Sequence, residues 1–131
     1  MSKKRILIVE DEQLLNEAYQ TILTREGYDV DSAFDGKEAL EKVKDADPDL
    51  ILLDLRMPRV DGLDFLREYK PSTEHPNVKI IVFSNLDEQS EIESAFELGA
   101  QKYIMKAWAT PKELVRIAAD MLANPVPADK A

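Results

Sequence analysis

Four charged residues of this chain stand directly after short apolar segments: Glu10, Asp11, Asp54 and Lys106. The apolar segments that precede them are residues 6–9, 50–53 and 103–105. In an open parallel sheet, the carboxyl ends of the strands meet at one edge, and ligands bind at that edge. We therefore expect three carboxylates and one ammonium to converge there from distant parts of the sequence.

The residue types at this edge indicate a cation and a phosphoryl group. Three carboxylates in a small volume repel one another strongly unless positive charge lies among them. A set of oxygen ligands without histidine or cysteine favours Mg²⁺ over Zn²⁺. With Lys106 as a second fixed positive charge, such a site could stabilise the negative charge of a phosphoryl group during its transfer. Ser84 follows the apolar run 80–83 and adds a hydroxyl that can donate to the same group.

The elements that must position these residues follow from the hydrophobic pattern. Short apolar runs alternate with longer amphipathic segments, which is typical of βα repetition and a parallel sheet. We predict strands at residues 5–9, 28–33, 49–53, 78–83 and 101–105. Several runs are apolar on successive residues, as expected of strands covered by helices on both faces. The predicted fold class is therefore α/β, with a doubly wound, five-stranded parallel sheet.

Each predicted strand is followed by a helix whose apolar residues recur at intervals of three or four, so that most share one face. In the first helix these are Leu14, Leu15, Ala18, Tyr19, Ile22 and Leu23, and in the fourth Ile92, Ala95 and Phe96. Gly27 and Gly99 follow helical segments, where a left-handed C-cap is expected. Thr110 and Glu113 fit a capping box with proline at the first helical position.

Composition and charge argue against several other classes of protein. The chain has 131 residues, a formal net charge of −9 and a pI of about 4.6, which argues against non-specific binding to nucleic acid or anionic membranes. Without cysteine, neither a disulfide framework nor a thiolate metal site can form. No apolar stretch has the length of a signal peptide or a membrane span, so a cytoplasmic location is expected. We expect one domain over residues 1–123 and a flexible tail over residues 124–131, and we expect His75 in a solvated loop without a functional role.

In this order and at these spacings, the charged residues resemble those of the receiver domain of two-component response regulators, of which the stand-alone chemotaxis regulator is the simplest type. The resemblance extends from about residue 5 to residue 122. It rests on the segments 8–12 and 54–58, on the pair 61–62, and on Ser84 and Lys106. It implies a flavodoxin-like sheet with the strand order 2-1-3-4-5.

The resemblance also implies a role for each acidic residue. Asp54 corresponds to the phosphoacceptor, and Asp11 to the principal direct ligand of Mg²⁺, which Mn²⁺ can replace. Glu10 corresponds to the second acid, which acts through a metal-bound water. The backbone carbonyl of Arg56 corresponds to the group that completes the metal shell.

The remaining family positions describe a switch. Ser84 corresponds to the hydroxyl that moves toward the phosphoryl group, Lys106 to the residue that pairs with that group, and Tyr103 to the aromatic side chain that turns inward in response. The fourth helix, last strand and fifth helix then form the output surface. We expect a single-domain switch rather than a turnover enzyme, phosphorylated by a sensor histidine kinase or phosphotransfer protein and acting on an unknown protein target.

Four positions depart from the family pattern or modulate its chemistry. Family members commonly have proline after the lysine, in a cis peptide, whereas this chain has Ala107. Asn85 stands where a small residue is usual and either narrows access to Asp54 or hydrogen-bonds the phosphoryl group. The two positions that tune the lifetime of the phosphorylated form are Arg56 and Leu86, and Leu86 cannot orient an attacking water.

Three alternative functions compete with a phosphorylated switch. A Mg²⁺-dependent phosphohydrolase of the haloacid dehalogenase type needs an acid two residues after its nucleophile, and that residue here is Arg56. A flavodoxin-like cofactor binder cradles phosphate after the first strand, where the acids 10–12 would repel it. A binding module that works without phosphorylation would have the same fold, but it would not need the set of Asp54, Ser84 and Lys106, which argues against it.

Overall fold

The structure is a computed structural model that describes residues 3–45, 47–57, 59–84, 89–108 and 110–123. Its strands form one parallel sheet in the order β2-β1-β3-β4-β5, as the resemblance implied. The strands are β1 (Arg5–Val9), β2 (Asp29–Ala33), β3 (Leu50–Asp54), β4 (Lys79–Ser84) and β5 (Lys102–Met105). The chain reverses its direction of travel across the sheet between β1 and β3, and this is where such folds bind ligands.

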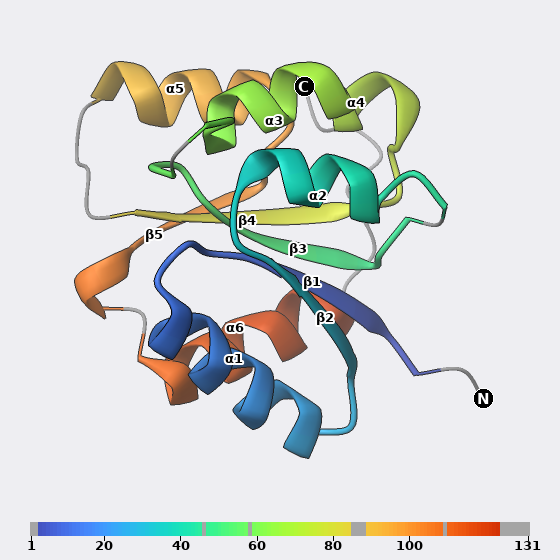
Figure 1. The fold of residues 1–131 in the computed structure, drawn as a ribbon, viewed down its shortest axis with the longest axis vertical. Helices are drawn as coiled ribbons and strands as arrows, with labels where there is room; N and C mark the ends of the chain where they lie inside the picture. The colour runs from blue at the N-terminus through green and yellow to red at the C-terminus, as the bar shows by residue number, and fades with distance from the viewer. Residues whose placement is uncertain (1–2, 46, 58, 85–88, 109, 124–131) are drawn as a thin grey trace.

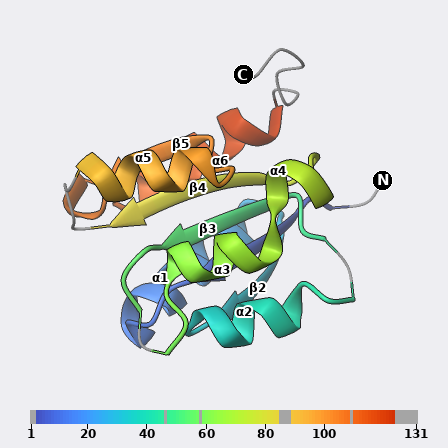
Figure 2. The same cartoon turned by 90° about the horizontal axis from the view of Figure 1, so that it is seen from above.

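Helices cover both faces of the sheet. They are α1 (Gln13–Arg25), α2 (Gly36–Lys42), α3 (Gly62–Tyr69), α4 (Pro71–Glu74), α5 (Gln89–Glu97) and α6 (Pro111–Ala123), with a 3₁₀ turn η1 (Lys106–Trp108) after β5. In Figures 1 and 2, α1 and α6 lie on one side of the sheet and α2, α3 and α5 on the other. The predicted doubly wound architecture is confirmed.

Each face of the sheet has its own buried cluster. One includes Leu7, Ile51, Leu53 and Val82, and the other Ile6, Ile8, Leu52 and Phe83. β3 and β4 are buried along their whole length, whereas the edge strands β2 and β5 are partly exposed. The central strands are apolar on successive residues because both of their faces are covered.

Most predicted strand boundaries differ from the observed ones by one residue, and this matters at two positions. Asp54 and Ser84 were expected just after β3 and β4 but are the last residues of those strands. Asp54 lies opposite Phe83 in the register, and Ser84 opposite Met105. The sheet therefore fixes the backbone of both residues.

The predicted helix faces are correct in part. Leu14 is 84 % exposed, Phe96 is 42 % exposed and Ala18 is also exposed, so these three were wrongly assigned to the buried faces. In α1 the fully buried residues are Tyr19 and Leu23, as predicted, together with the polar Asn16. A pattern based on apolar residues alone overlooks a polar side chain that is satisfied inside the protein.

The connection between α3 and β4 also differs from the expected loop. It contains the unpredicted helix α4, which begins after Lys70 in the left-handed region at φ 55°. His75 was expected in a solvated loop, but its ring stacks on Tyr69 with centroids 4.0 Å apart, and Nδ1 lies 2.8 Å from Oδ2 of Asp47. These contacts attach the end of α4 to the segment before β3.

The predicted helix ends are largely confirmed. Gly27 and Gly99 have φ values of +98° and +120°. Thr110 caps α6 by accepting a hydrogen bond from the Glu113 amide at 3.2 Å. The Glu113 carboxylate accepts a hydrogen bond from Arg116 at 2.7 Å. In the ranges described above, no helix has the length and apolar character to cross a membrane.

Candidate metal and phosphoacceptor site

Three carboxylates meet at the carboxyl edge of the sheet. β1 and β3 are neighbours, and the register places Val9 opposite Leu53, so the residues that follow lie side by side. Carboxylate oxygens of Glu10, Asp11 and Asp54 all lie within 4.8 Å of one another. Glu10 and Asp54 are buried, whereas Asp11 is exposed and forms the open side of the cluster.

Hydrogen bonds from backbone amides orient the two buried carboxylates. The Glu12 amide donates to Oε2 of Glu10 at 2.9 Å, which closes the turn after β1. The Arg56 amide donates to Oδ1 of Asp54 at 3.2 Å. Both buried carboxylates therefore accept a bond from the backbone two residues further along the chain.

Lys106 brings positive charge to the cluster from the end of β5. Its Nζ lies 2.8 Å from Oε1 of Glu10, 3.0 Å from Oδ2 of Asp54 and 2.9 Å from Oε1 of Glu12. The prediction that Lys106 reaches the acids is confirmed. Glu12 is an additional member of this network, for which the sequence pattern indicated no role.

The electrostatics reflect this crowding. Burial raises the pKa of Glu10 from 4.5 to about 7, against the opposing effect of Lys106. Burial likewise raises the pKa of Asp54. Burial alone would lower the pKa of Lys106, but its contacts with Glu10, Glu12 and Asp54 outweigh that effect and raise it. Lys106 therefore stays charged, and burial makes the ionised forms of Glu10 and Asp54 more costly than they are in water.

The cluster fits a small divalent cation. Its ligand atoms are oxygens, and Oε1 of Glu10 is buried without a well-aligned hydrogen bond from the described residues, although Lys106 lies near it. Negative charge at Glu10, Asp11 and Asp54 exceeds what one ammonium neutralises. Such an oxygen set suits Mg²⁺.

The structure places the other predicted site residues around the same edge. Ser84 is 1 % exposed at the end of β4, and Tyr103 is partly buried in β5, opposite Val82 in the register. The Arg56 side chain turns toward α5 and its Nη2 lies 3.3 Å from Oε2 of Glu91. The Lys106–Ala107 peptide bond is trans.

Asn85 and Leu86 lie outside the described residues. Their proposed effects on access to Asp54 and on the lifetime of the phosphorylated form remain predictions.

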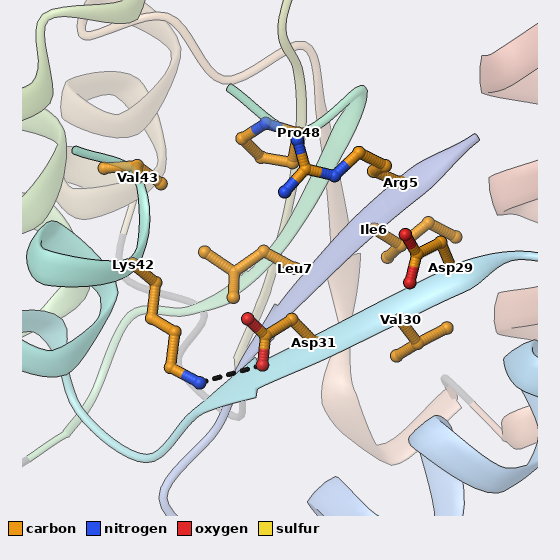
Figure 3. Close-up of a pocket in the computed structure, with 9 residues that line it drawn as sticks. All are labelled: Arg5, Ile6, Leu7, Asp29, Val30, Asp31, Lys42, Val43 and Pro48. Carbon is orange, nitrogen blue, oxygen red and sulfur yellow. Dashed lines mark hydrogen bonds and ion pairs between the residues drawn. The ribbon is translucent and has the colours of Figure 1, made fainter. Parts of the chain in front are cut away.

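A small pocket of about 150 Å³ lies elsewhere, beside the edge strand β2 (Figure 3). Its charged lining includes Lys42 and Asp31, which pair with each other at 2.8 Å. None of the site residues named above lines it. This pocket therefore does not contribute to the acidic site.

Comparisons with known proteins agree with this geometry. The family model described as "Response regulator receiver domain" matches residues 6–119. The chain is 40 % identical over 114 residues to the "Probable transcriptional regulator ycf27" of Porphyridium aerugineum, covering 87 % of this chain and 46 % of that protein. The chain thus spans about half the length of the curated relative that it matches.

Solved structures show the same architecture. A CheY-like receiver domain protein from Methanospirillum hungatei superposes with a TM-score of 0.85 at 30 % identity, over 93 % of this chain and 95 % of that one. The receiver domain of Francisella response regulator 1452 gives a TM-score of 0.80 at 27 % identity, over 92 % and 98 %. With the parallel sheet, the acidic edge and the family match over most of its length, the chain belongs to the response regulator receiver domain family.

Proposed function

We propose that this protein is a Mg²⁺-dependent phosphorylation switch in which Asp54 accepts the phosphoryl group. The observation that carries the proposal is the position of Asp54: it is 3 % exposed, within 4.8 Å of two further acids, and 3.0 Å from the Lys106 ammonium. Receiver domains interact with histidine kinases or phosphotransfer proteins, and these are the proposed donors. In the transfer, the bond from phosphorus to the donor's imidazole nitrogen breaks and a bond to an oxygen of Asp54 forms.

Glu10, Asp11, Asp54 and the backbone carbonyl of Arg56 would hold the metal ion. Mg²⁺, when bound, supplies positive charge that offsets the negative charge of the phosphoryl oxygens. The Arg56 amide orients Oδ1 of Asp54, and the Lys106 ammonium lies at the other carboxylate oxygen, Oδ2, where it offsets negative charge. The chain thus supplies preorganised groups, which is most of what phosphoryl transfer requires.

We propose that Ser84 and Tyr103 convey the change to the surface. Ser84 is buried beside the end of β5, where its hydroxyl can donate to the phosphoryl group. Tyr103 lies in β5, and Lys106 directly follows that strand. The Arg56–Glu91 pair connects the loop after Asp54 to α5. These connections favour α5, β5 and α6 as the output surface.

The switch part of this proposal is tested by ¹H–¹⁵N spectra before and after phosphorylation with acetyl phosphate and Mg²⁺. We expect shift changes around Asp54 and in α5, β5 and α6, and none of them in Asp54→Asn. Changes confined to residues 54–62 would refute the proposed output surface. An Asp54→Asn variant with the same changes as the wild type would show that they arise from Mg²⁺ or acetyl phosphate alone.

A further inference from the structure

The carboxyl end of β2 supplies no acid to the site, yet it contacts the turn that follows β1. The Glu10 amide donates to the Ala33 carbonyl at 3.0 Å. Asn16, which is fully buried in α1, donates from Nδ2 to the carbonyls of Glu10 at 2.8 Å and Ala33 at 3.2 Å. Its Oδ1 accepts from Gln20 at 2.8 Å, so both ends of the amide are satisfied. The backbone of Glu10 is thereby fixed to the end of β2.

Two residues further on, Asp35 contacts the loop that follows Asp54. Asp35 is 5 % exposed, and its Oδ2 pairs with Nη2 of Arg59. Burial alone would raise the pKa of Asp35, but the bonds from Arg59 and from the Glu38 amide hold it below its usual value. Its other oxygen, Oδ1, accepts from that Glu38 amide at 2.8 Å and caps α2.

The backbones of these two segments also touch. The Gly36 amide donates to the Val60 carbonyl at 2.9 Å, and a Cβ on Gly36 would lie 2.3 Å from that oxygen. Only glycine permits this approach. Arg59 has φ 67°, in the left-handed region that costs a residue with a side chain about 1–2 kcal/mol. A strained backbone at Arg59, whose exposed guanidinium pairs with the buried Asp35 carboxylate, indicates that the loop is held in place by its surroundings.

We propose that residues 33–36 hold the turn after β1, which carries the acids 10 and 11, and the loop after β3, which carries the Arg56 carbonyl, at the separation that Mg²⁺ binding requires. Asn16 acts on the Glu10 turn, and the Asp35–Arg59 pair acts on the loop that contains Arg56. All three are positioning residues, because they act through the backbone of the ligands. The inference rests on the proposed metal site and extends it to residues outside the acidic cluster.

The chain offers a matched control. Lys42, the last residue of α2, pairs with Asp31 of β2, with Nζ 2.8 Å from Oδ1, and Figure 3 shows this pair at the pocket beside β2. Loss of this pair removes another charge contact of the α2 segment without changing residues 33–36. If the effect on Mg²⁺ came from general loosening of α2, the control would show it too.

The test is calorimetric titration of Mg²⁺ into the wild type, Asp35→Asn, Arg59→Gly and Lys42→Ala. Asp35→Asn keeps an oxygen to cap α2, and Arg59→Gly removes the ion pair while relieving the left-handed strain. We expect the Mg²⁺ dissociation constant to rise about tenfold in the first two variants, as for other residues that orient metal ligands, and to stay unchanged in Lys42→Ala. The Mg²⁺ concentration for half-maximal phosphorylation should rise with it, at an unchanged plateau rate.

Thermal unfolding without metal separates positioning from stability. Arg59→Gly removes the partner of the buried Asp35 carboxylate and also the left-handed strain, whereas Asp35→Asn removes only the charge of that carboxylate, so the two variants should differ in unfolding temperature. Both should nevertheless weaken Mg²⁺ binding to a similar extent, which a purely structural role would not produce. Wild-type affinity in Asp35→Asn and Arg59→Gly would overturn the inference and leave the proposed function intact. If the wild type itself bound no Mg²⁺, the proposed metal site and this inference would both be wrong.

Discussion

At the scale of single residues, the acidic edge is a balance between buried negative charge and one ammonium. Glu10 and Asp54 are buried, and Lys106 lies within 3.0 Å of both. Each carboxylate would be costly to bury alone, and removing the partner of a buried charge is more destabilising than the pair is stabilising. The site therefore depends on Lys106 even before any phosphoryl group is present.

Replacement of Lys106 by methionine tests this dependence. We expect Lys106→Met to lower the free energy of unfolding by about 3 kcal/mol at pH 8 without metal, because two buried carboxylates lose their counter-charge. The loss should be smaller at pH 5, where those acids can take up protons. Urea unfolding measures both values, and Lys42→Met, which breaks a partly exposed pair, should change stability by less than about 1 kcal/mol. Equal losses in the two variants would contradict the account.

Leu86 carries a kinetic prediction. An aliphatic side chain cannot orient a water molecule for attack on the phosphoryl group, so we expect slow self-dephosphorylation. Decay of the phosphorylated protein can be followed by intact mass after removal of acetyl phosphate. Leu86→Glu, which restores a group that can hold water, should decay faster than the wild type. A wild-type half-life of seconds would contradict the prediction.

Residue types and spacing in the sequence suffice to predict Glu10, Asp11, Asp54 and Lys106 as one cluster, because parallel strands bring their carboxyl ends to a common edge. The supporting residues could not be found in this way. Asn16 is polar within an amphipathic helix, and nothing local shows that its amide lies inside the protein. The pairing of Asp35 with Arg59 depends on two loops that approach only in the folded chain.

At the scale of elements, the turn from β3 into α3 is tightly packed against the end of the strand that carries Asp54. The Gly62 amide donates to the Leu55 carbonyl at 3.0 Å. A Cβ on Gly62 would lie 2.6 Å from the Asp54 carbonyl oxygen and 2.8 Å from Cα of Leu55. Both contacts are with backbone, so a side chain at this position must displace the strand end that carries Asp54.

Gly62→Ala is therefore expected to destabilise the protein by roughly 3 kcal/mol and to weaken Mg²⁺ binding. Gly27→Ala is the matched variant, since Gly27 has φ +98° but a Cβ there meets nothing within 4 Å. It should cost only about 1 kcal/mol, from backbone strain, and leave Mg²⁺ affinity unchanged. Denaturant unfolding and Mg²⁺ titration measure the two effects. An equal cost in both variants would show that close packing at Gly62 is unimportant.

The strands β3 and β4 could be predicted from the sequence, because their residues are apolar in succession, as expected of strands that are covered on both faces. The short helix α4 could not, because four residues are too few to establish a period. Leu14 follows the apolar spacing of α1 yet is exposed, as is Ala18 four residues later, because both lie on the face of α1 opposite to the buried residues Asn16, Tyr19 and Leu23. Which face of a helix is buried depends on tertiary packing and not on apolar spacing alone.

At the scale of the whole molecule, the buried acids link folding to pH. The pKa of Glu10 is raised from 4.5 to about 7 in the folded protein, so the folded state keeps a proton that the unfolded chain releases in this interval. Protonation of Glu10 therefore contributes its full stabilisation of the metal-free folded state below pH 4.5, and this stabilisation is lost as the pH rises through about 7. The raised pKa of Asp54 acts in the same direction.

We expect the stability of the metal-free wild type, relative to Glu10→Gln, to fall by on the order of 3 kcal/mol between pH 4.5 and pH 7. The comparison with Glu10→Gln removes the contributions of titrating groups that do not interact with Glu10. Saturating Mg²⁺ should reverse the trend, because binding favours the ionised acids and releases protons. Urea unfolding with a chelator and with Mg²⁺ provides the measurement, and parallel pH profiles for the two proteins would contradict the account.

The central claim is that Asp54 accepts a phosphoryl group in a Mg²⁺-dependent reaction. Its most direct test is the intact mass of the protein after incubation with acetyl phosphate, with and without Mg²⁺, beside Asp54→Asn. We predict one phosphoryl adduct on the wild type, which requires Mg²⁺ and is missing from the variant. An adduct that persists in Asp54→Asn, or no adduct on a wild type that binds Mg²⁺ and has been offered a phosphorylated donor protein, would contradict the claim. The second result would indicate a receiver fold that acts by binding alone.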